Sequence, residues 1–206
     1  MTVPSRERLI SLFVEVLDYP GPGTAGALGE LERLLAGPAP AAADIVARHR
    51  DAVTPLPLGR LQEMYTGAFD LDTLSDLDAT VYPYVGHHLF GESYKRSAFL
   101  TELAGRFRAE GFEVERELPD HLVVILRYIV ARPDGELAAE LTVDAVIPAR
   151  ERMTGDLDEA GVATEPATGR QVYQLLLAAL RIVLEVVPGP GGDATVPVAA
   201  AGPTPD

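Results

Sequence analysis

A proline, aspartate and histidine followed at once by an apolar run constrain this chain more than any other stretch. Glu117-Leu118-Pro119-Asp120-His121 precedes residues 122–129, which are nearly all aliphatic. Proline suits the first helical position, because its φ is already helical and its missing N–H is not needed there. We therefore predict a helix that begins at Pro119. Asp120 and His121 would lie in its first turn, where unpaired N–H groups favour a carboxylate.

The apolar residues of this helix repeat with helical spacing. Leu118, Leu122, Ile125, Leu126 and Ile129 fall on one face, so the helix should be anchored in a core while its first turn opens to the surface. A purely structural interpretation stays open, in which Pro-Asp only starts a helix. Loss of the first-turn carboxylate would then cost about 0.3–1 kcal/mol.

The rest of the sequence predicts an all-α fold. The 206 residues suit one domain, cysteine and tryptophan are absent, and few runs could form strands. Apolar periodicity, caps and Pro/Gly stops predict further helices, one of them kinked or shortened by Pro148 and the last with a polar stripe of Gln174, Arg181 and Glu185. Their approximate ranges are 5–18, 24–36, 41–53, 58–69, 92–110, 136–152 and 170–187.

We expect one helical domain over residues 1–187 and a disordered Pro/Gly/Ala-rich tail over 188–206. Three segments inside the domain look irregular. Residues 70–81 are acidic, residues 82–91 form an aromatic stretch broken by proline and glycine, and residues 154–169 form a polar linker. The acidic segment does not fit a calcium loop, because Ser75 stands where glycine is required.

Charge narrows the classes of partner. Lysine and arginine number 17 against 31 aspartates and glutamates, a net charge of −14, so nucleic acid and anionic membranes should be repelled. A basic partner is the better expectation. No export signal is visible, residues 172–187 are too short and too polar to cross a membrane, and the absence of cysteine suits the cytoplasm.

The sequence does not match the common catalytic motifs. Gly91-Glu92-Ser93-Tyr94-Lys95 lacks the second glycine of a nucleophile elbow, and no phosphate-binding glycine motif occurs. His87, His88 and His121 could be drawn with Glu92 as a metal site, yet the spacing matches no zinc motif. We predict a non-catalytic binding protein without cofactor or metal. A metal- or nucleotide-dependent enzyme using His87, His88 and His121 stays open as the alternative.

The motifs resemble those of the TorD, DmsD and NarJ family of redox-enzyme maturation chaperones, over about residues 5–187. An acidic residue followed by Pro-Asp-His opens a helix at 117–121, and Leu17-Asp18-Tyr19-Pro20 ends the first predicted helix. Tyr65 and Phe69 match an aromatic helix end. Gly91-Glu92-Ser93 with Arg96 matches a structural turn. The NarJ branch is the most similar.

This resemblance implies an all-α cytoplasmic chaperone. Its partner would be the N-terminal peptide of a molybdoenzyme catalytic subunit, which the chaperone would hold until the molybdenum cofactor is inserted. For the NarJ branch this catalytic subunit is the nitrate reductase α subunit. The implied peptide-binding residues form an apolar groove with the Pro-Asp-His turn at its edge: Tyr65, Phe69, Tyr82, Tyr84, Glu117, Pro119, Asp120 and His121.

Several alternatives stay open at this point. Tyr82-Pro83-Tyr84-Val85 departs from the NarJ pattern, so another molybdoenzyme of the dimethyl sulfoxide reductase family, with proofreading of a twin-arginine signal, could be the client. An acidic helical scaffold is a third interpretation. We expect a monomer, with a helix-swapped dimer as the alternative.

Overall fold

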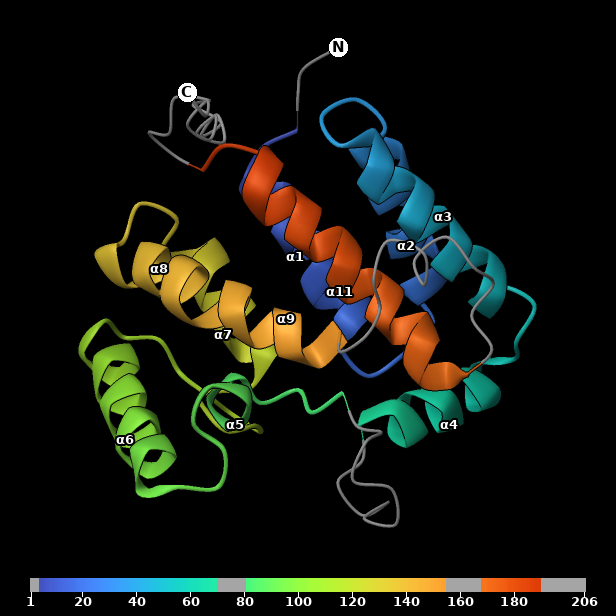
Figure 1. The fold of residues 1–206 in the computed structure, drawn as a ribbon. Helices are drawn as coiled ribbons and strands as arrows, with labels where there is room; N and C mark the ends of the chain where they lie inside the picture. The colour runs from blue at the N-terminus through green and yellow to red at the C-terminus, as the bar shows by residue number, and fades with distance from the viewer. Residues whose placement is uncertain (1–3, 70–80, 155–167, 190–206) are drawn as a thin grey trace, which may run out of the picture.

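The longest helix, α11 (Gly169–Val186), runs through the middle of the molecule and is the element around which the others pack (Figure 1). Apolar side chains occur on nearly every side of it, so it must be covered all round. Helices α1, α3, α4 and α9 contact it directly. In this computed structural model, residues 4–69, 81–154 and 168–189 are described.

The described residues are helical apart from turns, short connections and one isolated bridge. The predicted all-α class is therefore confirmed. The elements, in chain order, are α1 (Arg6–Leu17), α2 (Thr24–Leu35), α3 (Pro40–Val53), α4 (Leu58–Phe69), α5 (Val85–Phe90), α6 (Tyr94–Ala109), α7 (Leu122–Ala131), α8 (Glu136–Glu140), the π-helix η1 (Leu141–Val146), α9 (Ile147–Thr154) and α11. The acidic segment, the polar linker and the tail predicted from the sequence fall almost entirely outside the described residues.

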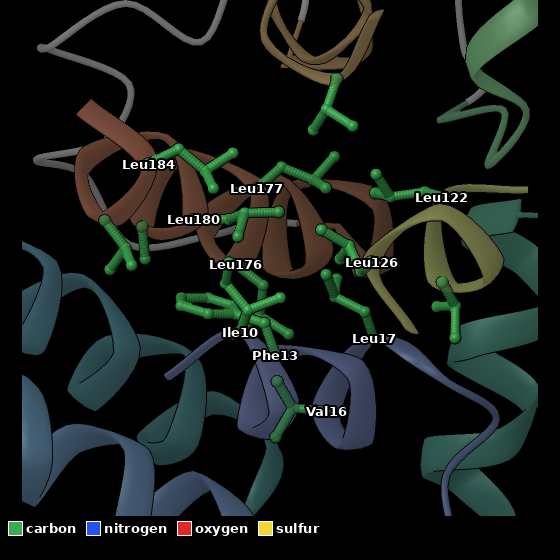
Figure 2. Close-up of a cluster of buried hydrophobic side chains, with 14 of the residues drawn as sticks. Ile10, Phe13, Val16, Leu17, Leu122, Leu126, Leu176, Leu177, Leu180 and Leu184 are labelled. Carbon is green, nitrogen blue, oxygen red and sulfur yellow. The ribbon is translucent and has the colours of Figure 1, made fainter. Parts of the chain in front are cut away.

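The core lies where α1, α7 and α11 meet. Figure 2 shows Phe13 of α1, Leu126 of α7 and Leu176 of α11 converging with their neighbours on one another. Phe13, Leu126 and Leu176 are completely buried. A Leu or Phe side chain buried in this way contributes about 1.5–3 kcal/mol. The apolar face predicted for α7 is thus buried from Leu122 to Ile129, but the prediction is wrong at Leu118, which is 46% exposed.

Local signals fixed several helix ends correctly. The Arg8 N–H donates to Ser5 Oγ at 3.3 Å, which confirms Ser5 as the cap of α1. Gly111 follows α6 with φ +67°, the left-handed conformation that favours glycine after a helix. The aromatic stretch 82–91 contains only the six-residue helix α5, in line with the prediction that no long regular element forms there.

Pro148 reshapes the helical run around it. Proline lacks an N–H and its ring collides with the carbonyl four residues before it, which here belongs to Asp144. The chain responds with the wider π-helix η1 over Leu141–Val146, where the Ile147 N–H bonds to Thr142 O, five residues back. Helix α9 then resumes. The predicted kink therefore takes the form of a π-helical segment between two short α-helices.

The polar stripe predicted on the last helix is wrong at one position. Gln174 is buried, and its amide nitrogen donates to the carbonyls of Met153 at 3.3 Å and Thr154 at 3.0 Å. These carbonyls lie at the end of α9, where no intrahelical partner exists. Gln174 of α11 therefore binds the C-terminal end of α9 through two buried hydrogen bonds. Only Arg181 and Glu185, an ion pair at 3.6 Å, reach solvent.

A buried histidine joins α3 to α11. His49 Nδ1 lies 2.8 Å from the carbonyl oxygen of Val172, and its ring packs edge-on against Tyr173 at 5.6 Å between centroids. Burial lowers the pKa of His49 from 6.5 to about 4, although the bond to Val172 opposes the shift. The imidazole is therefore neutral at pH 7.

This histidine should make the fold sensitive to acid. Below pH 6.5 the unfolded chain protonates His49 while the folded protein does not, so stability present above pH 6.5 is lost as the pH falls toward 4. The shift corresponds to about 3 kcal/mol. Urea unfolding at pH 7 and pH 4 should show a smaller loss for His49→Gln than for the wild type. Equal losses in the two proteins would contradict this assignment.

Candidate functional site

The turn before α7 does not start the helix where the sequence predicted. Helix α7 begins at Leu122, and Pro119 and Asp120 lie in a turn ahead of it. His121 is the N-cap, with an extended backbone at φ −65° and ψ 131°, and its Nδ1 accepts the Val123 N–H at 3.3 Å. The prediction of helix entry at Pro119 is wrong by one turn.

A second segment of the chain explains the delay. The Val85 N–H donates to Asp120 O at 2.8 Å, and the Leu122 N–H donates to Pro83 O at 2.7 Å. These two bonds form an isolated antiparallel bridge between Tyr84 and His121. Because a bridged residue is extended, His121 cannot adopt a helical backbone, and the helix starts only after it. The start of α5 is therefore joined to the start of α7.

Asp120 lies beneath this bridge and is fully buried. Its Oδ2 is 3.2 Å from Arg96 Nε of α6, and the Arg96 side chain is 17% exposed. Burial raises the pKa of Asp120, and the neighbouring Arg96 opposes that shift. Asp120 has no exposed surface in this structure, and its predicted part in peptide binding stays a prediction. Asp120 instead positions the turn.

Gly86 makes this arrangement possible. A Cβ at this position would lie 2.7 Å from Asp120 Oδ2 and 3.0 Å from Phe99 Cδ1, closer than such atoms approach. The residues predicted as a structural motif lie in the turn after α5 and in the first turn of α6. Gly91 adopts φ +62°, and Glu92 lies 3.5 Å from Arg96, with which it forms an ion pair. Gly91, Glu92 and Arg96 thus lie together behind the turn.

An aromatic hollow of about 310 Å³ opens in front of the turn. We call this feature the aromatic hollow. Helix α4 contributes Tyr65 and Phe69, whose ring centroids are 4.7 Å apart, and Tyr19 meets Tyr65 edge-on at 5.5 Å. Tyr173 of α11 packs behind both rings of α4. The lining residues are Tyr19, Tyr65, Thr66, Phe69, Pro83, Tyr84, Glu117 and His121.

Most of the rings remain partly open to solvent. Tyr19 is 55% exposed, and Tyr65, Phe69 and Tyr84 are half-buried. Two of the hydroxyls have partners, since Tyr65 donates to Leu17 O at 3.3 Å and Tyr84 donates to Glu117 Oε2 at 3.2 Å. Rings held in this way keep a fixed orientation while offering apolar surface to a ligand.

The polar groups that line the hollow include one carboxylate, that of Glu117, and no lysine or arginine. Burial raises the pKa of Tyr84, and the adjacent Glu117 carboxylate raises it further. Burial lowers the pKa of His121, although Glu117, Asp18 and Asp120 oppose that shift. A neutral His121 is the form that can accept the Val123 N–H. The hollow therefore combines aromatic faces, a neutral imidazole and one carboxylate.

Comparison with known proteins identifies the family. The family model described as nitrate reductase delta subunit matches residues 23–157. The chain belongs to the nitrate reductase delta subunit family. A crystal structure from Archaeoglobus fulgidus, described as a redox enzyme maturation protein, has the same fold, with a TM-score of 0.52 and 21% identity over 90% of this chain and 96% of that one. A search of curated proteins found no match.

These findings confirm the family resemblance drawn from the motifs. The matched region of the delta subunit family includes α4, the Tyr84 bridge and the turn before α7. It does not include Tyr19, which lines the aromatic hollow just after α1, or Tyr173 of α11, which packs behind Tyr65 and Phe69. Within the described ranges, no helix is both long and apolar enough to cross a bilayer.

Besides Asp120, two of the predicted peptide-binding residues do not line the aromatic hollow. The Tyr82 ring stacks on His87 at 4.5 Å, and the Tyr82 carbonyl lies 2.8 Å from His88 Nε2. Pro119 lines a separate hollow with Phe112 and Glu115. Tyr65, Phe69, Tyr84, Glu117 and His121 are the predicted residues that the fold brings together.

The histidines proposed for an enzymatic alternative have structural contacts. His88 is largely buried, which lowers its pKa, and His87 lies 3.7 Å from Glu92. Among the residues that the structure describes, no group of three or more histidines, aspartates or glutamates is arranged to hold a metal ion.

The sequence missed Tyr19 and Tyr173 as parts of the site. Tyr19 belongs to the Leu-Asp-Tyr-Pro motif that ends α1, so its place in a recognised motif was an available signal. Tyr173 carried no such signal. It reads as one more apolar position of α11, and only the crossing of α11 with α4 brings it to Tyr65 and Phe69.

Replacing Asp120 should cost much more than loss of a first-turn carboxylate. Asp120→Ala removes the buried partner of Arg96 and leaves it only the exposed Glu92, so we expect the free energy of unfolding to fall by about 2–4 kcal/mol. Chemical denaturation measures this loss. The double variant with Arg96→Met should recover part of it. A loss below about 1 kcal/mol would support the purely structural interpretation of a helix start.

Gly86→Ala should test the tight packing under the bridge. The added methyl group meets Asp120 and Phe99, so we expect a destabilisation of about 1–3 kcal/mol, measured by thermal or chemical unfolding. Gly105→Ala in α6 is the matched control, because nothing lies within 4 Å of its Cβ position. That substitution should be neutral or stabilising by about 0.5–1 kcal/mol. A neutral result for both would contradict the packing described here.

Proposed function

We propose that this protein is a non-catalytic cytoplasmic chaperone that binds the N-terminal peptide of a molybdoenzyme catalytic subunit. The nitrate reductase α subunit is the favoured client, and binding would hold it while the molybdenum cofactor is inserted and the complex assembles. Membership of the nitrate reductase delta subunit family and the shared fold with a redox enzyme maturation protein support this proposal. We further propose that the described helical unit acts as a monomer.

The aromatic hollow carries the proposal. Tyrosine is enriched where peptides and proteins bind, because its ring supplies apolar contact area and its hydroxyl supplies orientation. Several half-open rings gather here from α1, α4 and the segment before α5, next to the family's motif turn. A volume of about 310 Å³ has room for one or two side chains of a peptide.

The residues that line the hollow come from several separate elements. Tyr19 lies at the end of α1, Thr66 on α4 and Glu117 before the motif turn. A helical or turn-forming peptide could therefore place its anchor side chains in the hollow while its backbone rests on the rim. The bridge between Tyr84 and His121 keeps the floor in place without closing the opening.

Calorimetric titration with synthetic N-terminal peptides of molybdoenzyme catalytic subunits, nitrate reductase α among them, tests the proposal. Tyr19→Ala should weaken binding of the client peptide about tenfold, because a tyrosine anchor typically contributes more than 1 kcal/mol. Tyr19 is 55% exposed, so this substitution should leave the fold intact.

Tyr94→Ala is the matched control for this experiment. Tyr94 is 87% exposed at the start of α6 and does not line the aromatic hollow, so its removal should leave peptide affinity unchanged. Equal effects of the two substitutions would place the binding site elsewhere. The proposal would be overturned if no catalytic-subunit peptide bound and cells lacking this protein loaded the cofactor normally.

A further inference from the structure

The aromatic hollow differs in charge from four other hollows on the described part of the chain. Four other hollows each include at least one arginine in their lining, among them Arg60, Arg6, Arg108 and Arg50. The aromatic hollow includes the carboxylate of Glu117 and no lysine or arginine. Its aromatic lining therefore faces an uncompensated negative charge.

Two arginines near residues of the hollow already have carboxylate partners. Arg96 pairs with Asp120 at 3.2 Å, and Arg127 pairs with Asp18 at 2.5 Å. Glu117 is exposed and accepts only a hydroxyl hydrogen bond from Tyr84 among the contacts found in the described part of the chain. A carboxylate can accept further bonds at both oxygens. Glu117 thus keeps capacity for a cationic ligand.

The rings add a second attraction for a cation. Aromatic faces carry partial negative charge, and arginine is the residue that most often lies over them. One example is already present, because the Arg96 guanidinium carbon lies 5.6 Å from the centre of the Tyr84 ring. A planar guanidinium can also donate two parallel hydrogen bonds to a carboxylate, whereas a lysine ammonium cannot match that geometry.

We infer that the aromatic hollow receives an arginine side chain of the client peptide and that Glu117 selects it. This inference rests on the proposed function and adds the chemistry of the anchor. The guanidinium would pack among the rings of Tyr19, Tyr65 and Tyr84 and donate to Glu117. An apolar anchor could fill the same space but would gain nothing from the carboxylate, so the two anchors respond differently to Glu117→Gln.

The test uses probes that differ in charge but not in shape. N-acetyl-arginine methylamide is titrated into the intact protein, with the citrulline analogue as its neutral isostere, while the ring signals of Tyr84 and His121 are followed by NMR. In parallel, the nitrate reductase α-subunit N-terminal peptide is titrated by calorimetry with each arginine replaced in turn by citrulline. Both arms are repeated with Glu117→Gln and with Glu115→Gln, which removes the same charge outside the hollow.

We expect the arginine derivative to shift the Tyr84 and His121 signals and the citrulline derivative to leave them unchanged. Glu117→Gln should weaken binding of the arginine derivative and of the peptide about tenfold, and Glu115→Gln should not. One arginine-to-citrulline replacement should weaken peptide binding by a similar factor in the wild type and have no further effect in Glu117→Gln.

The outcomes separate this inference from the proposed function. A peptide that binds equally well with citrulline at every arginine position, or to Glu117→Gln as to Glu115→Gln, overturns the arginine anchor and leaves the chaperone function standing. Equal binding of the arginine and citrulline derivatives also overturns it. Selective binding of the arginine derivative without any peptide binding supports the arginine site and overturns the proposed client.

Discussion

The contact of Asp120 with Arg96 and the bridge beside it hold the candidate site together. The Asp120 carbonyl accepts the Val85 N–H, the Asp120 side chain accepts from Arg96, and Leu122 donates back to Pro83. Three interactions thus tie the segment before α5, and α6 beyond it, to the first turn of α7. Figure 1 shows α6 at the edge of the molecule, away from α11, so these links matter for its placement. Burial itself disfavours the charged form of Asp120. The main effect of its pair with Arg96 is therefore to hold the turn in position.

The site lies on a helix that leaves much of its surface uncovered. Helix α4 buries only Leu61 and Ala68 completely and leaves Tyr65 and Phe69 half-open, whereas α11 is buried along most of its length. The buried Tyr173 of α11 therefore contacts the partly exposed rings of Tyr65 and Phe69 on α4. Binding surfaces need apolar area that the fold has not already used, and α4 keeps that area exposed while α11 supports it from behind.

Some residues of the fold and the site have roles that follow from their local sequence, and others do not. Ser5, Gly111 and Pro148 each have a local physical reason for their role, namely a capping oxygen, a left-handed backbone and a missing N–H, and all three acted as predicted. Asp120 and Gln174 did not, because their partners Arg96 and the carbonyl of Met153 are distant in sequence. A buried polar side chain is placed by the partner it finds, and that partner cannot be read from its own neighbours.

The sequence by itself determined the helical class, most helix boundaries, the negative charge and the family motifs, because each depends on residue type and short-range spacing. Only the tertiary structure decided that helix α7 starts at Leu122, that Asp120 is buried, and that Tyr65 packs between Tyr19 and the buried Tyr173. The physical reason is the same in each case. Extended pairing with residues 83–85 and the crossing of α4 over α11 are long-range contacts, and they outweigh the local preference of Pro-Asp to begin a helix.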